Sequence, residues 1–137
     1  MVTSTAGYSG TPLHRKLGVK PGCRVLLSAA PPGFALDEVP PEAAVHTRAA
    51  GSSYDVIVAF CPDRARLDRR FGGLAGRLTT AGALWVAWPK RASGVATDLD
   101  ENVVRAVGLG EGLVDVKVIA IDETWSGLKF VRRLRDR

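Results

Sequence analysis

The sequence has few of the features that mark membrane, secreted or disulfide-rich proteins. In its 137 residues, no apolar run approaches the roughly 18–20 residues that a membrane-spanning helix needs. The N-terminal stretch MVTSTAGYSG has neither a basic start nor an apolar segment, so it does not resemble a signal peptide. These absences predict a cytoplasmic protein that does not enter a membrane.

Cysteine and histidine are also scarce, which limits the possible chemistry. Cys23 and Cys61 are too few for a disulfide scaffold in a chain long enough to build its own core. Neither has a partner at metal-ligand spacing, and His14 and His46 have no evident carboxylate partner. Cys61 could act as a nucleophile at a strand end, but a buried structural thiol is the commoner role. We therefore predict no catalytic residue, no metal site and no cofactor.

Composition and charge are those of a folded domain with a basic surface. Hydrophobic residues make up 46% of the chain and charged residues 24%, and the length suits one domain. The formal net charge is +5, and four arginines lie in the last segment, 132–137. They are not interleaved with aromatic residues, and no nucleic-acid motif is present. We therefore favour a solvated basic surface over a nucleic-acid interface.

Short apolar runs alternate with amphipathic segments along the chain. Strands are expected at 23–28, 44–47, 54–60, 83–88, 115–121 and 128–134. The second of these is weak, whereas the first, third and fourth are typical of strands buried on both faces. Strands that alternate with helices need crossover connections, which predicts a parallel sheet. The turn at 122–127 is too short for a crossover, so the last two strands should form an antiparallel hairpin.

Helices are expected over 12–17, about 63–78 and 98–108. Their predicted N-caps are Thr11, Asp63 and Asp98, the last in a capping box with Glu101. The apolar face of the second helix is expected to comprise Leu67, Phe71, Leu74 and Leu78. That of the third should comprise Leu99, Val103 and Val107. The first helix should end at Gly18 and the third at Gly108.

Four segments resemble parts of class I methyltransferases. LGVKPGCRVLL (17–27) is similar to the approach to their first strand, YDVIVAF (54–60) to their fourth strand, and LAGRLTTAGALWVAWP (74–89) to the helix, turn and fifth strand that follow. DVKVIAIDETWSGLKFVRRL (115–134) resembles their C-terminal hairpin. The resemblance implies an α/β, Rossmann-like fold, mostly parallel with an antiparallel C-terminal hairpin. It implies one methyltransferase-like domain over 11–137, preceded by a flexible N-terminus, 1–10.

A second resemblance is to a family of short bacterial proteins. GYSGTPLHRKLGVKPG (7–22), WPKRASGVATDL (88–99) and IDETWSGLKFVRRL (121–134) are together similar to the domain of unknown function 3052. This resemblance implies no activity.

The sequence departs from methyltransferases where those enzymes hold their cofactor. They bind S-adenosylmethionine with an acidic residue and a glycine-rich loop after the first strand, and with a second acid after the second strand. Here SAAPPGF (28–34) has one glycine, two prolines and no acid before Asp37, and the weak strand is followed by Arg48. One strand and one or two helices of the enzyme fold are also missing from the pattern. We therefore predict a non-catalytic binding domain; the alternative is a methyltransferase with an atypical cofactor loop.

Candidate binding residues follow the three strong parallel strands, whose loops should emerge at one edge of the sheet. Prolines stiffen these loops, and the helix that opens at Asp63 should offer unpaired N–H groups there. The hairpin turn is a second candidate, because 122–126 is richer in polar and aromatic residues than a tight turn requires. The predicted ligand- or partner-binding residues are Ser28, Pro32, Cys61, Trp88, Lys90, Ser93 and Trp125.

Alternatives to a binding role exist for several of these residues. Trp85 is predicted to be core, and Trp88 could be core as well. Lys90 and Ser93 could hold an anion or simply belong to a solvated loop. The ligand is a small molecule or a protein partner, and formation of a homo-oligomer is left open.

Overall fold

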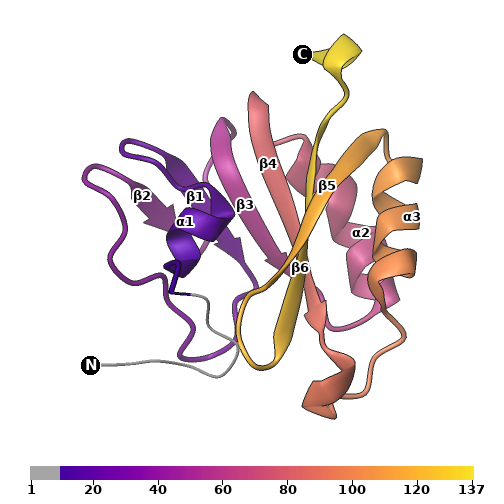
Figure 1. Cartoon of the computed structure of the whole chain (residues 1–137). Helices are drawn as coiled ribbons and strands as arrows, with labels where there is room; N and C mark the ends of the chain where they lie inside the picture. The colour runs from indigo at the N-terminus through magenta and orange to yellow at the C-terminus, as the bar shows by residue number, and fades with distance from the viewer. Residues whose placement is uncertain (1–9) are drawn as a thin grey trace.

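A six-stranded sheet organises the structure, a computed structural model that describes residues 10–137 (Figure 1). The strand order is β2-β1-β3-β4-β6-β5. The first four strands are parallel to one another: β1 (Arg24–Ser28), β2 (Ala44–His46), β3 (Tyr54–Phe60) and β4 (Leu78–Pro89). The last two are antiparallel: β5 (Leu113–Ala120) pairs with β6 (Trp125–Arg132), and β6 pairs with β4. The predicted sheet is confirmed, while the predicted flexible N-terminus lies outside the described residues except for Gly10.

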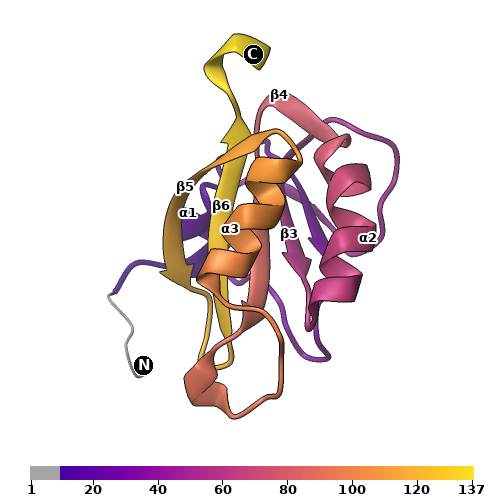
Figure 2. The same cartoon turned by 90° about the vertical axis from the view of Figure 1, so that its right-hand side faces the viewer.

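Helices cover both faces of this sheet. Figure 2 shows α2 (Arg64–Ala75) and α3 (Glu101–Gly110) on the near face and α1 (Leu13–Leu17) behind it. Two short 3-10 helices, η1 (Arg91–Ser93) and η2 (Leu134–Asp136), complete the structure. The molecule is therefore a three-layer α/β sandwich, with one hydrophobic core on each side of the sheet.

The alternation of side chains along β3 and β4 explains why both faces are apolar. On β3, Ile57 and Ala59 face α2 and α3, whereas Val56, Val58 and Phe60 face the α1 side. Trp85 of β4 is fully buried on the α1 side, where its indole Nε1 donates to the carbonyl of Leu17 at 3.1 Å. The predictions that these strands are buried on both faces and that Trp85 is core are confirmed.

Helix α2 begins as predicted, and α1 nearly does. The carboxylate of Asp63 accepts the N–H of Arg66 at 2.9 Å, and Gly18 ends α1 in the left-handed conformation at φ 84°. The predicted N-cap Thr11 is wrong, because Pro12 itself is the N-cap. Its ψ of 146° is extended, which leaves its carbonyl to accept the N–H groups of Arg15 and Lys16.

The N-cap and the last residue of helix α3 each lie two residues later than predicted. Its N-cap is Asp100, which accepts the N–H of Val103 at 2.8 Å, and not Asp98. Asp98 instead accepts the N–H of Arg64, while the hydroxyl of Thr97 donates to the carbonyl of Pro62. These contacts tie the segment before α3 to the start of α2, so the helix cannot begin there. The buried face is also shifted, to Val104, Val107 and Gly108, with Val103 only partly buried and Leu99 buried ahead of the helix.

Three strands begin earlier than the sequence predicts, among them β5, which begins at Leu113 and not at residue 115. Leu78, expected on a helix, is the first residue of β4 and pairs with Tyr54, beyond a register shift that leads to the Val56–Ala83 pair. β6 begins at Trp125 because Asp122 accepts the N–H groups of both Thr124 and Trp125 at 2.8 Å. This side-chain turn is tight enough to let Trp125 pair with Pro89.

Candidate functional site

The carboxyl ends of β1, β3 and β4 meet at one edge of the sheet, at the bottom of Figure 1. The chain passes from β1 outward to β2 and then returns to β3 on the other side of β1. The order therefore reverses between β1 and β3. In open α/β sheets, the crevice outside the carboxyl ends of strands at such a reversal is the usual place for a ligand.

A pocket of about 380 Å³ opens at this reversal, and we call it the arginine pocket. Its apolar wall comes from the loop after β1, from the end of β3 and from the hairpin, and α2 supplies only arginines. It is lined by Ala29, Phe60, Pro62, Arg66, Arg69, Arg70 and Trp125. None of these described lining residues is acidic, so the pocket is cationic with an apolar wall.

Arg70 connects the ends of β1 and β3 at the base of this pocket. Its guanidinium donates to the carbonyl of Phe60 at 2.8 Å, to the hydroxyl of Ser28 at 2.5 Å and to the sulfur of Cys61 at 3.4 Å. All three acceptors are neutral. Arg70 forms no ion pair within residues 10–137, although it is partly buried.

The other two arginines of the pocket are exposed. Arg66 lies 3.8 Å from a carboxylate oxygen of Asp63, a loose contact, because Asp63 also caps α2. Arg69 has no ion pair among the residues that the structure describes. Asp68, the nearest acid on the same helix, is bound to Arg64 at 3.0 Å. The positive charge of the pocket is therefore largely uncompensated.

Trp125 separates the arginine pocket from a second hollow. Its ring packs edge-on against Phe60 with centroids 5.2 Å apart, and Phe60 packs against Phe34 at 4.8 Å. The second hollow, of about 610 Å³, is enclosed by α1, the 31–35 loop and the hairpin turn. Because Trp125 is only partly buried, it offers an aromatic surface to both hollows.

Backbone strain occurs directly after β1. Ala29 has a φ of 58°, in the left-handed region that glycine adopts without cost. The residue lines the arginine pocket and follows Ser28, which binds Arg70. Strained residues cluster at ligand sites, which agrees with the location of this pocket.

Cys61 lies beneath the pocket as an inert thiol. It is fully buried, and this burial raises its pKa to about 11, against the smaller opposing effect of the Arg70 charge. The thiol is therefore protonated at neutral pH and is no nucleophile. The interpretation of Cys61 as a structural thiol agrees with this environment.

The structure brings some of the predicted site residues together and separates others. Ser28 and Cys61 contact Arg70, and Trp125 lines the pocket above them. Pro32 lines the second hollow instead. Trp88 is only 6% exposed and packs in the core under α2 and α3, so its side chain is not available to a ligand at this edge.

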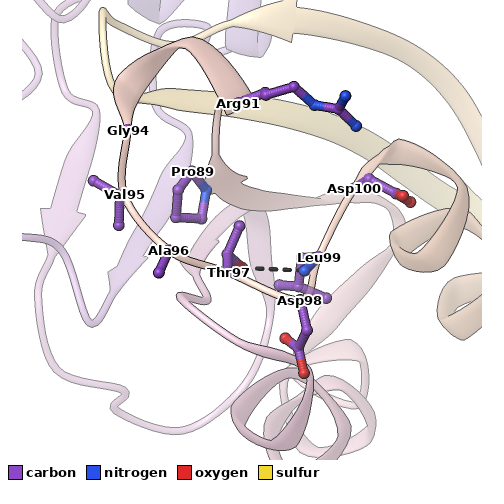
Figure 3. A pocket seen from close by; sticks show the side chains of 9 residues that line it. All are labelled: Pro89, Arg91, Gly94, Val95, Ala96, Thr97, Asp98, Leu99 and Asp100. Carbon is purple, nitrogen blue, oxygen red and sulfur yellow. Dashed lines mark hydrogen bonds between the residues drawn. The ribbon is translucent and has the colours of Figure 1, made fainter.

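Lys90 and Ser93 belong to a different part of the edge. The backbone N–H of Lys90 donates to Thr124 at 2.7 Å, and the hydroxyl of Ser93 donates to the carbonyl of Lys90 at 2.6 Å. A third hollow, of about 390 Å³, lies beside them and is lined by Pro89, Arg91 and residues 94–100 (Figure 3). Within it, Thr97 accepts the N–H of Leu99 at 3.1 Å, so its polar side chain is used to hold the loop.

The helix N-terminus offers less than expected. The N–H groups of Arg64, Arg66 and Leu67 are taken by Asp98, the side chain of Asp63 and the carbonyl of Asp63. The start of α2 therefore has fewer unpaired N–H groups than the sequence predicts. The charged donors that line the arginine pocket are guanidinium groups.

These arginines are not among the predicted site residues, although the sequence contains a signal for them. Arg66, Arg69 and Arg70 stand at i, i+3 and i+4, which places them on one face of α2. The helix begins at the carboxyl edge, so this face borders the reversal between β1 and β3. The spacing, combined with the predicted topology, would have identified them.

The residues at the edge do not fit S-adenosylmethionine as class I methyltransferases bind it. Ser28 ends β1 and Ala29 follows it, where an acid and glycines would be needed, and Thr47 and Arg48 follow β2. The ligand carries a positive sulfonium, which the three pocket arginines repel. Neither a carboxylate for the ribose nor one for the ammonium group lines the pocket in the described part of the chain.

Other kinds of site are not found within residues 10–137. No group of three or more histidine, cysteine, aspartate or glutamate side chains is arranged to hold a metal ion there. No helix in this range has both the length and the apolar character to span a membrane.

The chain is similar to solved methyltransferase structures. No protein-family model matches it, and no curated protein does. Magnesium protoporphyrin IX methyltransferase from Synechocystis PCC 6803, with bound SAM, has a TM-score of 0.61 and 12% identity, covering 88% of this chain and 74% of that one. A TehB-like SAM-dependent methyltransferase from Corynebacterium glutamicum has a TM-score of 0.57 and 12% identity, covering 93% and 91%. These similarities show a Rossmann-like, methyltransferase-like fold.

Proposed function

We propose that this chain is a non-catalytic binding domain of methyltransferase-like fold, which holds a small ligand in the arginine pocket. The observation that carries this proposal is Arg70. Its guanidinium binds Ser28 and Phe60 and so occupies the reversal point between β1 and β3 with a positive group. A protein partner that inserts a side chain beside Trp125 is the other form of the same proposal.

The lack of a general base around the pocket supports a non-catalytic role. The titratable groups among its described lining residues are arginines, which remain protonated at physiological pH. The adjacent thiol of Cys61 has a pKa of about 11, far from the neutral range in which a base or nucleophile works efficiently. Binding does not require such a group.

A methyltransferase with an atypical cofactor loop is the second candidate. The fold favours it, because the similar structures include an enzyme solved with bound SAM. In this case the 28–34 loop would have to hold the cofactor through its backbone, since it has no acidic side chain.

Calorimetric titration with S-adenosylmethionine and S-adenosylhomocysteine separates the two candidates. We expect no binding tighter than millimolar, because several hydrogen bonds worth about 1–3 kcal/mol each are missing. A SAM-dependent methyltransferase in the same buffer is the positive control. A micromolar dissociation constant for either compound would overturn the non-catalytic proposal and favour the second candidate.

Three further properties are proposed from the sequence. The segments 7–22, 88–99 and 121–134 support membership of the domain of unknown function 3052 family. The composition supports a cytoplasmic location, and the lack of interleaved aromatic residues and of a nucleic-acid motif argues against nucleic-acid binding. Light scattering at several protein concentrations tests whether the chain forms the homo-oligomer that was left open.

A further inference from the structure

We infer that the ligand of the arginine pocket is a small organic anion, with a phosphate or carboxylate group bound by Arg66 and Arg69 and an apolar part against Trp125. This inference rests on the proposed function, because it concerns the same pocket. It adds the chemical class of the ligand.

The positive charge of the pocket favours an anionic ligand. Three of the seven lining residues are arginines, and no acid is among the described ones. The two acids on this part of α2 are engaged elsewhere: Asp63 caps the helix, and Asp68 binds Arg64. An anion would compensate charge that the described residues leave unpaired, and guanidinium groups bind carboxylate and phosphate oxygens in pairs.

The close spacing of these like charges on α2 is also unfavourable for the helix. Arg66 and Arg70 are four residues apart and Arg69 lies between them on the same helical face, a spacing at which like charges destabilise a helix. The exposed guanidiniums of Arg66 and Arg69 contribute nothing to the core. A bound anion removes the repulsion and explains why the charges are gathered on the one face that borders the crevice.

The three arginines have different roles in the pocket. Arg70 has its guanidinium committed to Phe60, Ser28 and Cys61, so it supplies positive potential and shapes the base of the pocket. Arg69 has no partner within residues 10–137, and Arg66 has only the loose contact with Asp63. These two therefore have donors for the ligand.

The apolar wall limits what the anion can be attached to. Phe60, Pro62, Ala29 and Trp125 form it, and Trp125 is held in place by its edge-on contact with Phe60. A volume of about 380 Å³ lies at the small end of the range for ligand pockets. An aromatic carboxylate or a mononucleotide has the corresponding size and combination of charged and flat apolar parts.

Two matched pairs of probes test the inference and distinguish phosphate from carboxylate. Adenosine 5′-monophosphate is compared with adenosine, and benzoate with benzamide, by NMR titration of the ¹⁵N-labelled protein. Each pair differs in the anionic group and shares the flat ring. We expect at least one anion to shift the amide of Ala29 and the indole N–H of Trp125, with at least about tenfold tighter binding than its neutral counterpart.

Two variants of α2 separate a site from general attraction. Arg69→Gln removes a charge that lines the pocket, whereas Arg64→Gln removes the same charge from the same helix at a residue that does not line it. Both side chains are exposed, so both variants should remain folded, which circular dichroism checks. We expect Arg69→Gln to weaken anion binding at least about tenfold and Arg64→Gln to weaken it less than about threefold.

Several results would overturn the inference. These are no shift at the pocket with either anion at about 10 mM, equal affinity for an anion and its neutral counterpart, or equal losses in the two variants. Equal affinities at the pocket would leave ligand binding intact and refute only the anionic class. Micromolar binding of S-adenosylmethionine would instead refute the proposed function itself, so the two failures are distinguishable.

Discussion

Replacing Gly108 with alanine should destabilise the protein, although alanine is the better helix former. Gly108 is buried on α3 and faces the ring of Phe130 on β6. A Cβ atom at this position would lie 2.0 Å from Cε1, 2.4 Å from Cζ and 2.5 Å from Cδ1 of that ring. The ring has little freedom to retreat, because it is fully buried and packs edge-on against Phe71 with centroids 5.5 Å apart.

The expected magnitude follows from two opposing effects. Alanine in place of glycine inside a helix contributes about 1 kcal/mol of stability. Overpacking of a core costs about 1–3 kcal/mol, and contacts this short place Gly108→Ala at the upper end of that range. The net loss is about 2 kcal/mol. For a domain of this length, it should lower Tm by about 6–10 °C.

Gly73→Ala is the matched control in the other long helix. Gly73 is an exposed residue inside α2, and no atom lies within 4 Å of its potential Cβ. The same substitution there should increase the free energy of unfolding by about 0.5–1 kcal/mol. Urea unfolding followed by circular dichroism measures both variants. A Gly108→Ala variant as stable as Gly73→Ala would refute the close packing of α3 on Phe130.

Three further predictions use the same unfolding measurements or simple chemistry. Cys61, which is buried, should resist a thiol reagent at pH 8, whereas Cys23 should react. The pKa of Cys61 is raised from 9.0 to about 11, so between these pH values the folded state keeps a proton that the unfolded chain loses. The free energy of unfolding should therefore fall as the pH rises from 9 to 11. Ala29→Gly should stabilise the protein by about 0.5–1 kcal/mol, since relief of the strained φ exceeds the extra entropy of an unfolded glycine. Trp88→Ala should cost about 3–5 kcal/mol and Lys90→Ala less than about 0.5 kcal/mol, as measured by urea unfolding; equal losses would contradict the core position of Trp88.

The sequence predicts the central strands well because their burial is complete. β3 occupies the same residues, Tyr54–Phe60, that its apolar run indicates. The run is bounded by Gly51, Ser52 and Ser53 on one side and by Pro62 on the other, so local composition and burial on both faces define the same ends. Asp63 caps α2 for a similarly local reason, since the cap and its partner Arg66 are three residues apart.

Where the prediction fails, contacts between distant segments decide the boundary. Leu78 continues the 3.6-residue period of α2 and so suggests a longer helix, but in the structure it pairs with Tyr54. Trp125 joins β6 because the turn at Asp122 places it opposite Pro89, which is far back in the sequence. Asp98 satisfies the local rule for a helix cap as well as Asp100 does, yet it is used by Arg64 of α2. None of these partners is visible in a local pattern.

The difference between Trp88 and Trp125 illustrates why the site is harder to predict than the fold. Both stand beside the same sheet edge in the sequence pattern. The alternation of β4 places Trp88 on the face that α2 and α3 cover, together with Leu84 and Val86. Trp125 pairs with the last residue of β4, so it lies at the rim, where it lines two hollows. Which face a helix covers is a property of the topology, and it decides whether an aromatic ring is core or surface.

The arginines of α2 are the residues on which the proposed anion site depends. In a helix pattern, Arg66, Arg69 and Arg70 count only as positions that are not apolar, which predicts a solvated face. The topology suggests a binding role for these arginines, because it places the first turns of α2 beside the reversal of strand order between β1 and β3. The class I methyltransferases that the sequence resembles use acids at this edge to hold a cationic cofactor. Here the arginine pocket is cationic, and because attraction depends on the sign of the charge, this pocket should select an anion.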